Sequence, residues 1–139
     1  MIVVDTNVLS ESMRERPEPR VAAWLDQRAE AEIFTTAITK AEILYGIEIS
    51  PPGKKRSRWV TAAERIFIGM WSNRVLAFDG EAARHYAQIA AFRKACGREM
   101  QGADAQIAAI CRLHNATLAT RNIRDFEDCG IRVVNPWEA

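Results

Sequence analysis

The chain has 139 residues, of which 48% are hydrophobic and 27% are charged, and its formal net charge is +1. This length and composition suit one globular domain with a single hydrophobic core, and they exclude a disordered or fibrous chain. There is no run of about 18 apolar residues and no charged segment leading into a short apolar one at the start. We therefore expect no membrane-spanning helix and no secretory leader, and we predict a cytoplasmic protein.

The charge and the cysteines restrict the chemistry only in part. A near-neutral net charge neither requires nor excludes a nucleic-acid partner, because a local basic patch matters more than the sum. Fifteen of the 19 basic residues are arginines, whose planar guanidinium groups bind phosphate well. Cys96, Cys111 and Cys129 are odd in number and widely spaced, which predicts reduced thiols rather than a disulfide framework or a zinc site.

Hydrophobic periodicity and turn residues predict strands that alternate with helices. The first half of the chain is expected to form a strand at 2–4, a helix at 6–13, a helix that begins near Pro19, a strand at 33–35, and a helix from Thr39 to about 49. The stretch SPPGKKRSR, residues 50–58, is predicted to be a basic loop.

The second half continues the same alternation. Its predicted elements, in chain order, are a helix at 59–71, a strand at 75–78, helices at 80–96 and 102–114, and strands at 118–120 and 131–134. Such alternation predicts one α/β domain over residues 1–139, with a mostly parallel sheet covered by helices on both faces.

Acidic and amide side chains follow the ends of the predicted strands. Asp5 comes directly after the first strand, and Glu42 lies in the first turn of the helix after the second. Asp104 lies in the first turn of the helix that precedes TLAT, while Asn122 and Asp125 follow strand 118–120. Ligands of open parallel sheets bind beyond the carboxyl ends of the strands, so these four segments can share one edge.

Each acid also has a purely structural explanation. Asp5 is a suitable cap for the helix that follows it, and Thr39 and Glu42 have the capping-box spacing. The helix dipole favours Asp104, and Asp125 suits an Asx-turn. Caps, however, are not required to converge on one place.

Convergence of the acids would demand a counter-charge. Two carboxylates about 4 Å apart repel by roughly 4 kcal/mol at an effective dielectric constant near 20, so either protons or a cation must relieve them. An all-oxygen cluster without His or Cys favours Mg²⁺ or Mn²⁺ over zinc. Water bound to such an ion is a nucleophile suited to phosphodiesters.

Four segments of the chain, in order, resemble a known family: VVDTNVLSE, TAITKAEILYGI, GADAQIAAICRLHNATLATRNIRDF and VVNPW. They resemble PIN-domain ribonucleases and, more narrowly, the toxins of VapBC-type toxin–antitoxin modules near the FitB-like branch. The D-T-N start alone is a weak motif. Its combination with T-x-x-E-[LI]-x-x-G, D-x-x-I-A-A and T-R-N-x-x-D-F is specific.

The resemblance implies an α/β/α sandwich, a PIN domain, with Mg²⁺- or Mn²⁺-dependent endoribonuclease activity. It also implies inhibition by a cognate VapB/FitA-like antitoxin, contact with DNA only through that antitoxin, an RNA substrate and a homodimer. By this resemblance Asp5, Glu42 and Asp104 are the metal ligands.

The resemblance also assigns supporting residues. Thr6 and Asn7 match the polar residues beside the first acid, and Thr120 belongs to the T-R-N motif. The fourth acid of the family falls at Asn122, an amide here, and we expect Asp125 either to replace it or to act through water.

Other polar and aromatic residues have two interpretations each. Five basic residues are candidate contacts for RNA phosphate, with a solvated surface as the alternative: Arg121, Arg124, Lys54, Lys55 and Arg56. Three aromatic residues are expected in the core or a dimer interface, with base stacking as the alternative: Trp59, Phe67 and Trp71. Both histidines, His85 and His114, are predicted to be structural.

Two other functions remain open from the sequence. A metal-dependent phosphatase or a receiver-like phosphoacceptor would also place an Asp after the first strand. A catalytically weak PIN fold would act only as a module that binds RNA or the antitoxin, and the amide at Asn122 is its only sequence support.

Overall fold

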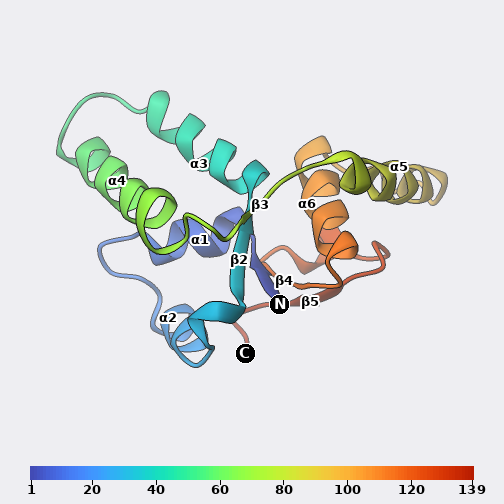
Figure 1. Cartoon of the computed structure of the whole chain (residues 1–139), viewed down its shortest axis with the longest axis horizontal. Helices are drawn as coiled ribbons and strands as arrows, with labels where there is room; N and C mark the ends of the chain where they lie inside the picture. Colours follow the sequence, from blue (N-terminus) through green and yellow to red (C-terminus); the bar gives the residue numbers. More distant parts are fainter.

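The computed structural model describes residues 1–139 and alternates short strands with helices (Figure 1). The strands are β1 (Ile2–Val4), β2 (Ile33–Thr36), β3 (Val75–Leu76), β4 (Thr117–Ala119) and β5 (Arg132–Val134). The α-helices are α1 (Thr6–Ser12), α2 (Pro19–Asp26), α3 (Ala37–Glu48), α4 (Lys54–Glu64), α5 (Gly80–Ala95) and α6 (Gly102–Leu113). Three further segments complete the chain, namely the 3-10 turns η1 (Glu30–Glu32) and η3 (Ile123–Phe126) and the π-helical segment η2 (Arg65–Met70).

The five strands form one parallel sheet in the order β3-β2-β1-β4-β5. The chain builds outward from β1 through β2 and β3, and then returns to the other side of β1 with β4 and β5. The strand order therefore reverses between β1 and β4, where open α/β sheets bind their ligands. A receiver-like domain has the order 2-1-3-4-5, so the receiver-like alternative is wrong for this chain.

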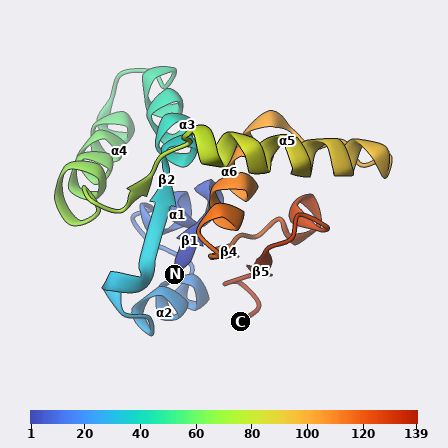
Figure 2. The ribbon, with the colours of Figure 1, turned by 45° about the vertical axis from the view of Figure 1, so that its right-hand side comes forward.

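Helices cover both faces of the sheet because successive strand residues point to opposite sides. In β1, Val4 belongs to the core cluster under α1, α2 and α3, whereas Val3 belongs to the cluster under α5 and α6. Ala119 and Leu118 of β4 divide in the same way. Figures 1 and 2 show α3 and α4 on one side of the sheet and α5 and α6 on the other, which confirms the predicted α/β/α arrangement.

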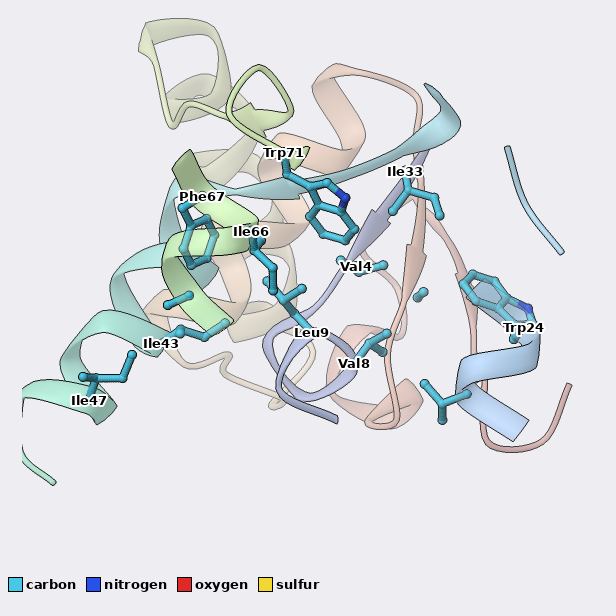
Figure 3. Packing of buried hydrophobic residues seen from close by; sticks show 13 residues of the cluster. Val4, Val8, Leu9, Trp24, Ile33, Ile43, Ile47, Ile66, Phe67 and Trp71 are labelled. Carbon is cyan, nitrogen blue, oxygen red and sulfur yellow. The ribbon is translucent and has the colours of Figure 1, made fainter. Parts of the chain in front are cut away.

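The first core is built around large side chains from elements far apart in the sequence. Trp71, Phe67 and Ile66 approach Val4 and Leu9 from one end, and Trp24 and Ile33 lie at the other (Figure 3). Burying a side chain of this size contributes about 1.5–3 kcal/mol relative to leaving it exposed. Trp71 and Phe67 are 9% and 7% exposed, so the expected core role of these two residues is confirmed.

Two predicted helix starts were wrong. Helix α3 begins at Ala37, two residues before Thr39, since the Thr36 hydroxyl caps it by accepting the Thr39 backbone N–H at 3.1 Å. Glu42 is consequently beyond the first turn and does not form a capping box. Helix α4 begins at Lys54, directly after the helix-breaking sequence Pro51–Gly53, so the basic stretch predicted as a loop is mostly the first turns of a helix.

The helix predicted to run to residue 71 ends as an α-helix at Glu64 and continues as the π-helical η2. The remaining boundaries lie within two residues of those predicted, and β3 is only two residues long. All three cysteines are free thiols; Cys111 and Cys129 are buried and Cys96 is exposed. None of the helices combines the length and the apolar character that crossing a bilayer requires.

Candidate active site

Asp5 lies at the point where the sheet order reverses. The register pairs Val4 with Ala119, and the Asp5 N–H continues the ladder by donating to the Ala119 carbonyl at 2.9 Å. Asp5 is also the N-cap of α1, because its Oδ1 accepts the Thr6 N–H at 2.8 Å. The side chain is only 5% exposed. Asp5 can therefore cap α1 and also present a carboxylate at the carboxyl end of the sheet.

The second oxygen of Asp5 faces the end of β4. Oδ2 accepts a hydrogen bond from the Thr120 hydroxyl at 2.7 Å and another from Asn7 Nδ2 at 3.3 Å. The Thr120 hydroxyl oxygen in turn accepts the Asn122 N–H, and Asn7 Oδ1 accepts the Arg121 N–H, both at 3.1 Å. This hydrogen-bond network links Asp5 to the loop that carries Asn122.

Glu42 reaches the same edge from α3. Its Oε1 accepts a hydrogen bond from the Thr6 hydroxyl at 2.6 Å, and the hydroxyls of Thr6 and the buried Thr39 lie 3.1 Å apart. Glu42 itself is exposed. A short donor from the residue next to Asp5 thus fixes the direction of a carboxylate that solvent would otherwise leave mobile.

The charges of the acids interact. Burial raises the pKa of Asp5 above its ordinary value, hydrogen bonds from Thr120 and Thr6 oppose that rise, and the negative charges of Glu42 and Asp125 add to it. Burial, followed by the charges of Asp5, Asp125 and Glu42, raises the pKa of Asp104 to about 6. Carboxylates from four segments therefore share one electrostatic environment.

Asp104 and Asp125 occupy less constrained positions than Asp5. Asp104 lies half-buried in the first turn of α6, and its side chain makes no hydrogen bond within the chain. Asp125 is exposed in η3, and its carboxylate forms no Asx-turn, so the structural explanation given for it above is wrong. The side chain of Asn122 is also exposed and forms no cap.

The donor set suits a hard divalent cation by its chemistry. All candidate ligands are carboxylate oxygens, with an amide beside them, and the nearby negative charge has no basic partner among the ion pairs of the chain. No three His, Cys, Asp or Glu side chains lie close enough together to hold one ion. The raised pKa of Asp104 shows that the charges interact at somewhat longer range.

The predicted basic contacts divide into four groups. Arg121 and Arg124 line one cavity of about 410 Å³ together with Asn122 and Asp125. Lys55 lines a second cavity, of about 320 Å³, with Thr6 and Glu42. Arg56 instead donates to the Ile47 carbonyl at 3.0 Å and pairs with Glu48 at the end of α3. Lys54 is exposed and lines none of these cavities.

Several residues around the site carried no recognisable signal in the sequence. Thr39 was interpreted as a cap, although its buried hydroxyl supports Thr6. Arg93, 5% exposed, lowers the pKa of Asp104 by its charge. Trp137 was considered only as part of the closing VVNPW, and yet Arg121 lies over its ring at 5.0 Å from the centroid. Such contacts join distant segments, so no local pattern predicts them.

The parallel sheet and the carboxylates at its point of strand-order reversal define a small α/β domain with an acidic, oxygen-lined site. The sequence pattern of the PIN domain matches residues 2–130, and the chain belongs to the PIN-domain family.

Named relatives cover nearly the whole chain. Plasmid stability protein StbB of Pseudomonas syringae pv. tomato is 40% identical over 139 residues, 100% of both chains. Toxin FitB of Neisseria gonorrhoeae is 39% identical over 137 residues, and VapC ribonuclease Y4jK of Sinorhizobium fredii is 38% identical over 138 residues, each match covering 99% of both chains. A solved structure of FitAB bound to an IR36 DNA fragment is similar with a TM-score of 0.91 and 39% identity, covering 99% of this chain and 96% of that one.

Proposed function

We propose that this chain is a metal-dependent endoribonuclease that acts as the toxin of a type II, VapBC-like toxin–antitoxin pair. The observation that carries the proposal is that Asp5 and Glu42 are brought together through Thr6 at the carboxyl end of β1, where the Thr6 hydroxyl donates to Glu42 at 2.6 Å. Burial of Asp104, followed by the charges of Asp5, Asp125 and Glu42, raises the pKa of Asp104 at the same place. Similarity to a VapC ribonuclease and to toxin FitB over 99% of the chain supports the choice of RNA as substrate.

Asp5, Glu42 and Asp104 are the proposed ligands of one Mg²⁺ or Mn²⁺ ion, with Asp125 completing the acidic group. Since no three of these side chains lie close enough together to hold one ion directly, part of the set would bind it through water, as Mg²⁺ sites commonly do. The bound cation would lower the pKa of a coordinated water and neutralise charge that develops on the phosphate. Because no basic residue pairs with these carboxylates, they remain available for a cation.

The protein residues orient the acids before any ligand arrives. Thr120 and Asn7 direct Oδ2 of Asp5, Thr6 directs Glu42, and the Asn122 N–H holds the Thr120 hydroxyl in place. Neither histidine takes part: His114 is exposed at the end of α6, and His85 is on α5. The proposed reaction therefore rests on positioned oxygen atoms and charge stabilisation.

The proposed partners follow from the relatives and from the surface. FitAB and its DNA fragment form one solved assembly, and we infer a comparable antitoxin here, with DNA reached only through it. Large apolar side chains are exposed on α3 (Leu44 and Tyr45), at its C-cap (Ile49) and on η2 (Ile68 and Met70). Exposed apolar surface of this kind marks protein interaction sites, and we propose that it serves the antitoxin and a homodimer contact in the cytoplasm.

The substitution Asp5→Asn tests the proposal. We expect loss of Mn²⁺-dependent cleavage of RNA, while the metal-free protein unfolds at the same temperature or slightly higher, because the amide still caps α1 and a desolvated charge is removed. The measurements are a gel assay of RNA cleavage and thermal unfolding by circular dichroism. A large fall in the unfolding temperature would assign Asp5 a structural role alone.

The same assay addresses the binding-only alternative. If the wild-type chain binds RNA and antitoxin but no divalent metal produces cleavage, the chain is a catalytically weak PIN domain. Asn122→Asp is then the first substitution to test for recovery of cleavage.

A further inference from the structure

We propose that a cavity beside the acids binds an unpaired nucleotide next to the cleaved phosphodiester, with its base stacked on Trp137. This inference rests on the proposed ribonuclease function and specifies its substrate as single-stranded at that position. We call the cavity the tryptophan pocket. Its volume is about 610 Å³, and the residues that carry the argument are Asn7, Lys55, Arg58, Trp59, Arg121 and Trp137.

The tryptophan pocket is continuous with the acidic site through Asn7. Asn7 lines the pocket and donates from Nδ2 to Oδ2 of Asp5 at 3.3 Å. Its Oδ1 accepts the N–H of Arg121, another residue of the pocket wall, at 3.1 Å. A polynucleotide whose phosphate sits at the acids therefore has its neighbouring nucleotide beside this cavity.

Two tryptophans give the pocket its aromatic surface. Trp59 and Trp137 are both partly buried against the first core, and both line the cavity. The backbone of Trp137 is held on both sides, since its N–H donates to Asn135 Oδ1 at 2.9 Å and its carbonyl accepts from Arg20 at 3.2 Å. A ring fixed in advance loses little conformational freedom when a base stacks on it.

The charges of the pocket favour an anionic ligand. Four basic side chains line it against two carboxylates, Glu11 and Glu15. Those two carboxylates are paired with Arg14 and Arg58 at 3.3 and 3.5 Å. Lys55 and Arg121 have no acidic partner. The Arg121 guanidinium lies over the Trp137 ring at 5.0 Å from its centroid, so a stacking base would take its place on the ring and leave the guanidinium to the phosphate.

The combination identifies the ligand class. Unpaired cations beside fixed aromatic rings are the features by which proteins bind single-stranded nucleic acid, where bases stack and phosphates follow the positive groove. Bases within a duplex are stacked on each other and unavailable to Trp137. A cationic peptide segment would instead be disfavoured by the excess of basic groups.

The test measures binding without cleavage, using the full chain in EDTA and a short labelled oligoadenylate. Trp137→Ala is expected to weaken binding by roughly five- to one-hundred-fold, the range for loss of one stacked base, and Trp137→Phe to retain most of it. The matched control is Phe92→Ala, an exposed aromatic residue on α5 outside the pocket, which should bind like the wild type. Lys55→Ala should reduce the salt dependence of binding by about one phosphate contact.

An abasic position moved along the oligonucleotide makes the test specific for stacking. In the wild type, an abasic site at one position should weaken binding as much as Trp137→Ala does. In Trp137→Ala the same abasic site should cause no further loss of binding, because the two changes remove the same contact. Independent, additive losses would overturn the inference. If Trp137→Ala does not fold, the same comparison is made between the wild type and Trp137→Leu, which keeps an apolar side chain without an aromatic face, and additive losses again overturn it.

The two proposals can fail separately. Absence of Mn²⁺-dependent cleavage, with the abasic pattern intact, would overturn the ribonuclease proposal and leave the nucleotide pocket. Cleavage with no effect of Trp137 on RNA binding would overturn the pocket alone. Normal RNA binding by Trp137→Ala together with lost antitoxin affinity would assign the cavity to the antitoxin and also overturn this inference.

Discussion

Asp5 is the only carboxylate in the chain that is almost fully buried, and each of its oxygens has a different task. Oδ1 caps α1, and Oδ2 is directed by Thr120 and Asn7 at the end of β4. The capping interpretation and the site interpretation are thus not alternatives. A cap keeps the side chain in one rotamer, which is what a ligand of a metal ion also requires.

The effect on folding stability of burying a carboxylate beside the other acids can be measured at Asp104. Its pKa is raised from 3.8 to about 6, so the folded chain binds a proton more tightly than the unfolded chain and loses stability as the pH rises through that window. Asp104→Asn should therefore raise the free energy of unfolding by about 1–2 kcal/mol above pH 7, after a discount for solvent screening of a half-exposed group. The gain should be absent below pH 3.8.

Urea unfolding of the metal-free protein at both ends of this pH range measures the effect of Asp104→Asn. Glu99→Gln is the matched control, since Glu99 is exposed and has no ion-pair partner. A gain that is equal at both pH values would mean that charge is not its cause.

The roles of Asn122 and Asp125 in metal binding can be distinguished by measuring the Mn²⁺ affinity of variants at each position. Asp125→Ala should weaken Mn²⁺ binding by roughly ten-fold, because it removes a negative charge that acts on both Asp5 and Asp104. Asn122→Asp should tighten binding by adding a carboxylate, and Asn122→Ala should change it little. Calorimetric titration gives the three dissociation constants. Unchanged affinity in Asp125→Ala, with a loss of about 1 kcal/mol in stability, would restrict Asp125 to shaping its turn.

At the scale of elements, η3 is held in place by the end of α5. The buried Arg93 donates from Nε to the Arg98 carbonyl at 2.8 Å and from Nη1 to the Glu127 carbonyl. Arg98 donates to the carboxylates of Glu127 and Asp128 at 2.8 and 2.7 Å. Two arginines therefore hold the segment that directly follows η3, and η3 is the 3-10 turn that carries Asp125.

Arg93→Met should lower the free energy of unfolding by about 2–4 kcal/mol, because it leaves two buried or partly buried carbonyls without their charged donor. Arg84→Met is the matched control on the same helix, since its exposed pair with Glu81 is worth less than about 1 kcal/mol. Equilibrium unfolding in urea compares the two. Equal losses would show that the contacts of Arg93 do not hold the segment.

At the scale of the whole molecule, the acidic site is open to a cation from solvent or from a partner. A guanidinium group pairs with carboxylates in a bidentate way. We therefore expect the antitoxin to insert an arginine among the acids, and we expect rising Mg²⁺ to weaken inhibition. Inhibition of RNA cleavage is measured against Mg²⁺ concentration, with NaCl of matched ionic strength as the control for screening. Inhibition that does not depend on Mg²⁺ would place the contact elsewhere.

The sequence by itself determined the alternation of strands and helices and the candidate acids. Runs such as Ile2–Val4 and helices such as α5 follow from local hydrophobic periodicity, and Asp5 follows its strand directly. The start of α3 was misplaced because Thr36 and Thr39 are equally suitable caps, and only the paired end of β2 selects Thr36. The start of α4 was misplaced because a basic sequence after Gly53 suits either a loop or an exposed helix.

Only the tertiary structure decided the order of the strands, the link from Thr6 to Glu42 and the pocket around Trp137. Each of these depends on segments that are far apart in the chain: Glu42 is 36 residues from Thr6, and Thr120 is 115 residues from Asp5. Local patterns report which face of an element is buried, but the choice of neighbour is made by packing the whole core. The acids were therefore predictable one by one, whereas their hydrogen-bond partners and the aromatic wall beside them were not.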